Sequence, residues 1–301
     1  GGATTGCHNV GIGTGSLGVT AVTSIYNIAI GGNAMDALTT GICNVAIGTN
    51  ALGASTTGCR NIAIGELALG AGVTTGIDNI AIGTISMDAL TTGKCNIALG
   101  YNAIGASTTG CLNVAIGNLA LGQADTTGTK NIALGYAAMD ALTTGLCNVA
   151  IGRSALGAST TGCRNVAIGE SALGAADTTG INNIAIGLTA MDALTSGACN
   201  IAMGVNALGA ITVGNENIAI GENSMDALTT GICNVAIGAS ALRVSTTGCN
   251  NIAIGELALG AADTTGINNI AIGINTLDAL TTGICNVAIG AYALSGSTTG
   301  C

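Results

Sequence analysis

One short motif, Asn-(Ile/Val)-Ala-(Ile/Leu)-Gly, recurs along the whole chain of 301 residues. Fifteen copies match it, and variants beginning at Asn9 and Asn200 bring the number to 17. Successive copies lie 17 or 18 residues apart, usually in the order 17, 17 and 18, which makes a super-repeat of 52 residues. Between Met191 and Met225 the spacing falls to 34, so one unit of a super-repeat is missing there. A unit of this length is too short for a helix–turn–helix repeat.

The apolar residues of one unit alternate as they do in a β-strand. The two isoleucines that flank Ala63 share one face of a strand, and Ala63 takes the other. Gly65 ends this strand, and the apolar pair Ala68 and Leu69 begins a second short strand. The Thr-Thr-Gly sequence that follows predicts a corner in which the glycine supplies positive φ. Each unit is therefore expected to form one coil of two short strands and two turns.

Stacking of these coils predicts an all-β protein, a β-solenoid (β-helix or β-roll) of about 17 coils. At about 4.8 Å per coil, this solenoid would be a rod about 80 Å long. We expect one continuous domain over residues 1–301. Because the chain opens without Met and closes partway through a unit, we also expect it to be an excerpt of a longer repeat array without visible caps.

The composition agrees with a narrow solenoid. Ile, Val and Leu at fixed positions are expected to form internal ladders, while Ala and Gly let the walls approach closely. The chain has no Phe, Trp or Pro, since wide side chains would not fit and a Pro would remove a ladder hydrogen bond. An apolar share of 49% and a mean hydropathy of +0.64 are far from the composition of disordered chains. No stretch approaches 18 apolar residues, so no membrane insertion is expected.

The motif asparagine is predicted to form an internal amide ladder at the corner of the coil. Stacked amides would satisfy backbone groups that the turn leaves unpaired. The same residue recurs in every coil, so this role is structural and marks no single active site. The ladder is assigned to Asn27, Asn44, Asn61, Asn79, Asn96, Asn113, Asn131, Asn148, Asn165, Asn183, Asn200, Asn217, Asn234, Asn251, Asn269 and Asn286.

Of the 12 cysteines, all except the last residue, Cys301, occur either directly before the motif asparagine, as Cys43 does, or two residues before it, as Cys59 does. In adjacent coils, Cα atoms at matching positions lie about 5 Å apart, within the disulfide range of roughly 4.4–6.8 Å. We therefore predict the disulfides Cys43–Cys59, Cys95–Cys111, Cys147–Cys163, Cys233–Cys249 and Cys285–Cys301. Such bonds imply an oxidising, extracellular location.

Two cysteines are expected to remain unpaired. Asn215 occupies the position where a partner of Cys199 would lie, and the partner of Cys7 would precede Gly1. Metal binding by the cysteines is the alternative interpretation. The chain has no Cys-x-x-Cys, however, and His8 is its only histidine, so no metal site is expected.

Charge and residue types also argue against most chemistry. Six basic and 15 acidic residues give a net charge of −9, without a basic patch for nucleic acid. The glycines form no phosphate-binding motif, and His8 has no orienting partner. Acidic residues at equivalent positions of successive super-repeats would lie three coils, or about 14 Å, apart. We therefore interpret them as solvated charges and expect neither an enzyme nor a cofactor. They are Asp36, Asp88, Asp140, Asp192, Asp226 and Asp278, and, after the motif glycine, Glu66, Glu170, Glu222 and Glu256.

Two functions of different classes remain. The first is a structural element, either an extracellular fibre or filament subunit or the shaft of an adhesin, stabilised by disulfides between coils. The alternative is an ice-binding solenoid, because Thr-Thr-Gly recurs in 15 places and would build ladders of threonine. Adjacent threonines point to opposite faces, so only one column at each corner would face outward. An ice-matching surface would need two.

The string TTGCRNIAIGELALG, residues 56–70, resembles the NxAIGxxAL…TTG repeats of phage tail fibres and large bacterial surface proteins, and similar strings cover essentially the whole chain. It is also similar to the NxxAIG coils of trimeric autotransporter adhesin heads, which form β-rolls. The resemblance implies an attachment or shaft role on a cell surface, a secreted filament or a virion. Those adhesin heads have shorter coils and usually lack cysteine, so their trimeric assembly is not carried over.

Assembly is expected on physical grounds as well. Open coils at both ends and outer faces rich in alanine with little charge favour contact with further copies. The expected partner is the chain itself, as a homo-oligomer or an end-to-end filament. A cell-surface receptor or a glycan is a further candidate partner.

Overall fold

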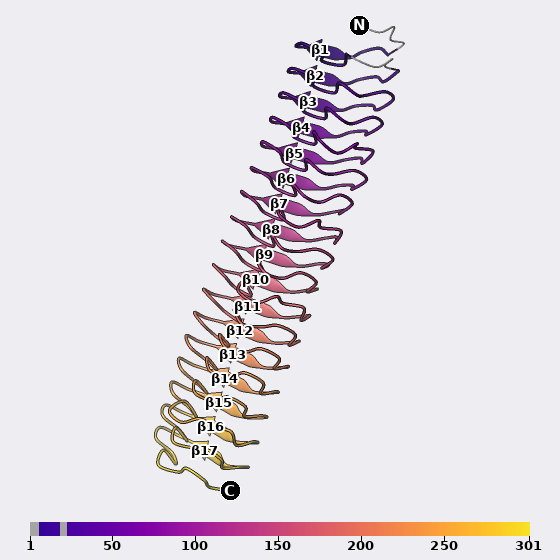
Figure 1. Cartoon of the computed structure of the whole chain (residues 1–301). Coiled ribbons are helices and arrows are strands. Elements are labelled where there is room, and N and C mark those ends of the chain that lie inside the picture. Colours follow the sequence, from indigo (N-terminus) through magenta and orange to yellow (C-terminus); the bar gives the residue numbers. More distant parts are fainter. Residues whose placement is uncertain (1–5, 19–22) are drawn as a thin grey trace. The chain divides into compact units, whose positions relative to one another are not determined.

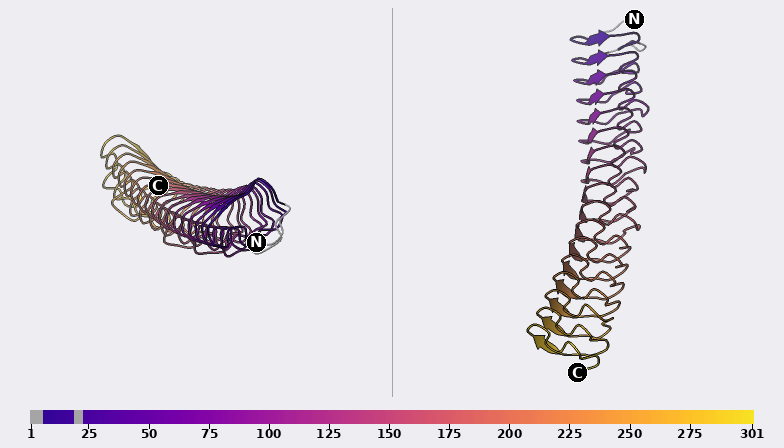
Figure 2. Two further views of the ribbon diagram at one scale, coloured as in Figure 1. Left: turned by 90° about the horizontal axis from the view of Figure 1, so that it is seen from above. Right: turned by 90° about the vertical axis from the view of Figure 1, so that its left-hand side faces the viewer.

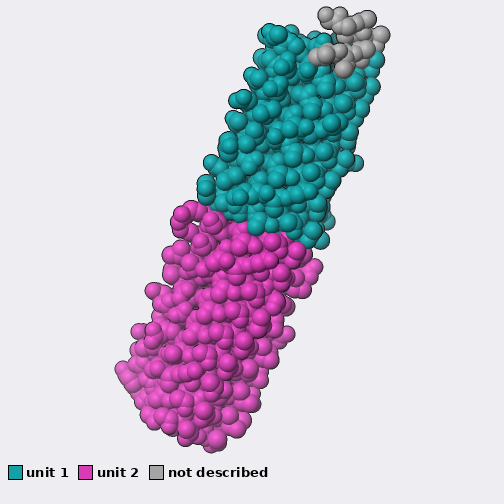
Figure 3. Space-filling model, viewed as in Figure 1, with its two compact units in different colours: residues 1–147 teal, residues 148–301 magenta. Residues whose placement is uncertain are grey.

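A computed structural model describes residues 6–18 and 23–301 of the chain and divides it into two compact units, residues 1–147 and 148–301 (Figure 3). The described residues contain short strands joined by turns, without a helix (Figure 1). The first unit holds β1 (Val10–Ile12), β2 (Ile28–Ile30), β3 (Val45–Ile47), β4 (Ile62–Ile64), β5 (Ile80–Ile82), β6 (Ile97–Leu99), β7 (Val114–Ile116) and β8 (Ile132–Leu134). The second holds β9 (Val149–Ile151), β10 (Val166–Ile168), β11 (Ile184–Ile186), β12 (Ile201–Met203), β13 (Ile218–Ile220), β14 (Val235–Ile237), β15 (Ile252–Ile254), β16 (Ile270–Ile272) and β17 (Val287–Ile289).

Within each unit, every strand pairs in parallel with the strand of the next coil. The pairing joins equivalent residues, as when Ala63 of β4 lies opposite Ala46 of β3 and Ala81 of β5. The turns stack in the same way, since the Leu52 N–H donates to the Ala68 carbonyl at 2.9 Å. This arrangement confirms the predicted all-β β-solenoid. Each unit is a solenoid by itself, and the continuity of one domain over residues 1–301 stays a prediction.

The central alanine of the strand, and not its two flanking residues, faces the interior. Ala63 is fully buried, whereas Ile62 and Ile64 on either side are only partly buried. The expectation that strand Ile and Val would form internal ladders is therefore wrong. The interior space opposite the alanines is filled by residues of the turns, such as Leu69 and Met87, which are fully buried. Only a small side chain fits between these large residues and the strand backbone.

The predicted second strand is a turn. Ala68 and Leu69 are both fully buried, as expected for an apolar pair, but Leu67 and Leu69 have φ of 55° and 51°. A left-handed residue on each side of Ala68 prevents an extended strand there. Each coil therefore contains one three-residue strand, along one side of the coil in each unit, and a long run of turns (Figure 2).

The glycine with positive φ is the one that ends the strand, not the one in Thr-Thr-Gly. Gly65 has φ of 135°, while Gly58 lies outside the left-handed region. Gly58 is a glycine for a different reason, because an added Cβ would lie 2.9 Å from Asn61 Nδ2 and 3.1 Å from the Thr74 carbonyl oxygen. The predicted source of the positive φ is thus wrong, and close packing between coils explains the corner glycine.

Candidate functional site

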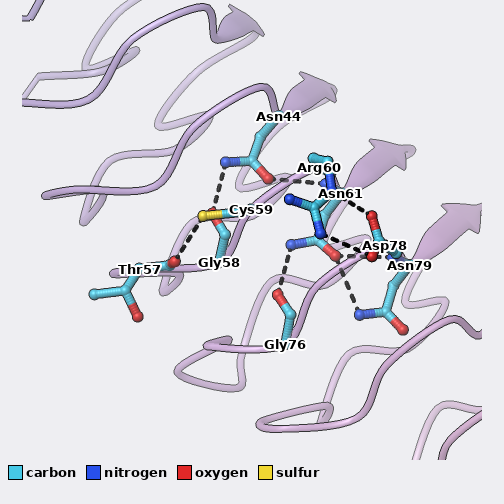
Figure 4. Close-up of polar contacts among 9 residues, drawn as sticks. All are labelled: Asn44, Thr57, Gly58, Cys59, Arg60, Asn61, Gly76, Asp78 and Asn79. Carbon is cyan, nitrogen blue, oxygen red and sulfur yellow. Dashed lines mark hydrogen bonds and ion pairs between the residues drawn. The ribbon is translucent and has the colours of Figure 1, made fainter.

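The motif asparagine links three coils, with its side-chain amide bonded to the next coil and its backbone N–H to the preceding one (Figure 4). Asn61 Nδ2 donates to the Gly76 carbonyl at 2.9 Å, and Asn61 Oδ1 accepts from the backbone N–H of Asn79 at 3.0 Å. The Asn61 N–H itself donates to Asn44 Oδ1 at 2.9 Å. Because these groups are buried, each hydrogen bond removes a desolvation cost that the corner would otherwise carry.

The same geometry recurs in coil after coil. Of the 16 asparagines assigned to the ladder, all except Asn286 are at most 1% exposed, and Asn286 is partly buried. Asn9, which was not assigned to the ladder, belongs to it as well, because its Oδ1 accepts from the Asn27 N–H at 2.9 Å. An amide that recurs in this way and forms its hydrogen bonds inside the coil stabilises the backbone. It does not form a reactive or ligand-binding group.

The outer face of the strands is aliphatic, so the expectation of outer faces rich in alanine is wrong there, because the strand alanines point inward. At both outward positions every strand carries Ile, Val, Leu or Met, without a polar or charged exception. Ile82 is 38% exposed, Ile116 40% and Met203 41%. Each unit therefore presents two columns of half-exposed aliphatic side chains, which we call the aliphatic face. The signal was present in the sequence, because positions 62 and 64 and their equivalents never carry a polar residue.

Charged residues flank the aliphatic face. Arg60 lies directly before the motif asparagine and binds Asp78 of the next coil, with Nε to Oδ1 at 2.6 Å and Nη2 to Oδ2 at 2.9 Å (Figure 4). The hydrogen bond from Arg60 lowers the pKa of Asp78 below its ordinary value. After the motif glycine, Arg153 Nη2 donates one hydrogen bond to Glu170 Oε1 of the next coil. These exposed pairs contribute little stability, so their effect is to place charge at the edges of the face.

The aspartates after Met or Leu are not the solvated charges that we expected. All six are partly buried, and Asp192 accepts a hydrogen bond from the Ala175 N–H at 2.8 Å. Burial raises the pKa of Asp88 and of Asp140, although hydrogen bonds to each carboxylate oppose the shift. The four glutamates after the motif glycine are exposed, as expected.

The structure contains all 12 cysteines as free thiols. The predicted pairs Cys43–Cys59, Cys95–Cys111, Cys147–Cys163, Cys233–Cys249 and Cys285–Cys301 are therefore not disulfide-bonded in it, and Cys7 and Cys199 are free as well. The two members of a pair do not occupy matching positions. Cys43 is equivalent to Arg60 in the next coil, and Cys59 forms a bridge with Ile77. The Cys59 thiol points to the Thr57 carbonyl at 3.3 Å.

The threonines of the corner divide as predicted into an inner and an outer column. The Thr39 hydroxyl donates to the Thr56 carbonyl of the next coil at 2.8 Å, while Thr40 and Thr57 are exposed. The first copy, Thr4-Thr5, lies outside the described residues. Only one threonine column per unit thus faces outward, which is half of what an ice-matching surface would need.

The remaining candidates are His8 and the side chains that could bind a metal ion. His8 is exposed and stacks on Tyr26, with ring centroids 5.0 Å apart. Across residues 6–18 and 23–301, His, Cys, Asp and Glu form no group of three or more that could hold a metal ion. Over the same ranges, no helix has the length and apolar character needed to cross a membrane. No family model matches the chain, and no curated protein matches it significantly.

Proposed function

We propose that this chain is a non-enzymatic structural protein, a subunit of an extracellular fibre or filament or the shaft of an adhesin. The observation that carries the proposal is the aliphatic face, which recurs on every strand of both units. A binding or catalytic site normally differs from its surroundings, whereas here each coil repeats the same surface. Such uniformity favours a role in which length and contact along the chain matter more than one site.

The partner that best fits the aliphatic face is a second copy of the chain. Three residues of strand and eight strands at about 4.8 Å give unit 1 a face of about 400 Å², and unit 2 has one strand more. A standard interface buries about 800 Å² on each partner, so the face of each unit by itself supplies about half of that size. A copy of the same repeat has the same spacing between strands, and its side chains therefore stay in register with these over many coils.

The proposal includes an extracellular setting, in which the five cysteine pairs would be oxidised. Oxidation of the five cysteine pairs would join neighbouring coils, and each bond would close a loop of about 15 residues, worth about 3 kcal/mol. Disulfides persist at the cell surface, in secreted filaments and on virions. An adhesin shaft would carry a receptor-binding or glycan-binding part, and either ligand is a candidate partner of the assembled fibre.

Sedimentation and electron microscopy test the proposal together. The chain is expected to sediment well above its monomer mass of 28.7 kDa and to form elongated assemblies, with and without reductant. The triple variant Ile47→Lys, Ile82→Lys and Ile116→Lys places charge on the aliphatic face. It is expected to keep the circular dichroism spectrum of the wild type and to sediment as a monomer, because lysine at these half-exposed positions opposes contact without entering the core.

The matched control places the same charges on the exposed threonine column, as Thr57→Lys, Thr92→Lys and Thr109→Lys, and is expected to assemble like the wild type. A wild-type chain that stays monomeric at every concentration would overturn the proposal. Inhibition of ice recrystallisation by that monomer, lost in the threonine variant, would instead support the ice-binding alternative.

A further inference from the structure

The residue before each motif asparagine forms an outward column in which one thiol has a special neighbour. Glu216, Cys233 and Asn250 occupy this column on successive coils of the second unit, as their backbone N–H bonds to the preceding coils show. The Cys233 Sγ lies 3.3 Å from Glu216 Oε2, so the thiol donates to the carboxylate. Cys249, the other member of the pair, points to its own Thr247 carbonyl at 3.4 Å.

A matched arrangement in the first unit lacks this contact. Asp78 precedes Cys95 in the column as Glu216 precedes Cys233. The Asp78 carboxylate, however, is held by two hydrogen bonds from Arg60 on its other side. In the second unit, the column position before Glu216 is Cys199, which offers no cation. Glu216 is thus available to the thiol, and Asp78 is engaged elsewhere.

The carboxylate changes the chemistry of the thiol. The hydrogen bond to Glu216 raises the pKa of Cys233, with smaller contributions from burial and from the charges of Glu216 and Cys249. Since the thiolate is the nucleophile in alkylation and in oxidation, a thiol whose proton is held reacts more slowly at neutral pH. No other described thiol donates to a carboxylate in the structure.

We propose that Glu216 protects the Cys233 thiol, so that the Cys233–Cys249 pair is oxidised more slowly than the matched Cys95–Cys111 pair. With hydrogen peroxide as the oxidant, the first thiolate forms an S–O bond as the O–O bond breaks, and one water is released. The second thiol then attacks the sulfenic sulfur and a second water leaves, so the two sulfurs lose two electrons to the peroxide. The product is one of the disulfides between coils that the proposed function includes. Only in this respect does the inference rest on the proposed function.

Pulsed alkylation of the reduced full-length chain with iodoacetamide near pH 8, followed by tandem mass spectrometry, measures each thiol separately. Cys233 is expected to react severalfold more slowly than Cys95. In Glu216→Gln, which keeps an acceptor oxygen but removes the charge, the Cys233 rate is expected to rise towards that of Cys95. The control Glu222→Gln removes an exposed carboxylate of the same coil and should leave the Cys233 rate unchanged.

Disulfide formation with hydrogen peroxide should follow the same order. Equal rates for Cys233 and Cys95 in the wild type would overturn the inference. An unchanged Cys233 rate in Glu216→Gln would also overturn it. The reaction would then be slowed by steric shielding from the side chain at position 216 and not by its charge. In guanidinium chloride both thiols should react equally. These rates are read on monomers and assemblies alike, so failure here is distinct from failure of the proposed assembly.

Discussion

At the scale of single residues, the glycine that ends each strand has the most demanding position. Gly65 has φ of 135°, and an added Cβ would lie 2.6 Å from the carbonyl oxygen of Gly83 in the next coil. A side chain there is strained by both the backbone and the contact. We predict that Gly65→Ala lowers the free energy of unfolding by roughly 1–3 kcal/mol, measured by urea denaturation followed by circular dichroism.

The chain offers a control for the same substitution. Gly296 lies outside the left-handed region, and an added Cβ would meet nothing within 4 Å. Gly296→Ala is therefore expected to be neutral or slightly stabilising, since it reduces the entropy of the unfolded chain. If Gly65→Ala were as stable as Gly296→Ala, the close stacking of the strand ends would be contradicted.

The half-buried aspartates give a pH dependence of defined sign. The folded-state pKa of Asp88 is raised by burial, so the folded state binds its proton more tightly than the unfolded state, whose carboxyl titrates near 3.8. The ionised carboxylate therefore costs stability at neutral pH, and this cost disappears as the pH falls through the folded pKa to 3.8. We predict that Asp88→Asn raises the melting temperature at pH 7 and that its advantage vanishes in acid, measured by thermal denaturation.

Asp78 provides the opposite case. Its folded-state pKa is lowered by Arg60, so the ionised form contributes stability above the ordinary value of 3.8, and this contribution is lost as the pH falls through the lowered pKa. Asp78→Asn should accordingly be neutral or slightly destabilising at pH 7. If Asp88→Asn and Asp78→Asn changed the stability at pH 7 in the same direction, burial would not be the cause of the raised pKa of Asp88.

At the scale of the elements, the sequence predicted the strand and its register but not which face turns inward. Period-two alternation shows that Ile62 and Ile64 share one face of the strand. It is equally consistent with that face pointing into the interior or towards solvent. The inward direction depends on the volume of Leu69 and its neighbours across the coil, which no local pattern contains. The second strand was wrongly predicted for a different reason, because an apolar pair such as Ala68 and Leu69 is buried in a strand and in a turn alike, and the left-handed φ of Leu67 and Leu69 leaves no mark in the residue types.

The corrected orientation of β4 predicts opposite tolerances for neighbouring residues. Ala63 is fully buried between equivalent alanines, so Ala63→Leu should overpack the interior and cost about 1–3 kcal/mol or more. Ile64→Thr changes a half-exposed position and should preserve the fold. Urea midpoints for both variants measure the difference. A larger loss of stability in Ile64→Thr than in Ala63→Leu would show that the isoleucines, and not the alanine, face the interior.

The asparagine ladder and the cysteines show how far the sequence predicts the candidate site. Strict recurrence of a polar residue among apolar neighbours was enough to predict an internal amide ladder, and the hydrogen bonds of Asn61 have that form. Recurrence also predicted that Cys43 and Cys59 lie in neighbouring coils. It did not fix their relative orientation, because a one-residue offset in a left-handed turn decides where each thiol points.

At the scale of the whole molecule, the second unit shows that coils are interchangeable as long as they are whole. One unit of the super-repeat is missing between Met191 and Met225, yet β11, β12, β13 and β14 still pair in register. The asparagine ladder also continues, with the Asn217 N–H on Asn200 Oδ1 at 3.0 Å. Register is thus carried by contacts between adjacent coils and is independent of the order of coil types.

This nearest-neighbour stacking predicts which deletions the chain tolerates. Removal of residues 45–61, one coil of 17 residues, joins Asn44 to Ile62 and restores the motif. Each remaining inner coil keeps two neighbours, so the ellipticity per residue should be unchanged and stability should fall by no more than the contribution of one coil. Removal of residues 45–53 instead deletes the strand while keeping the corner, which breaks both the aliphatic face and the ladder, and should lower the ellipticity and the urea midpoint much further. If removal of residues 45–53 were tolerated better than removal of residues 45–61, the number of deleted residues, and not the register between coils, would determine the stability of the solenoid.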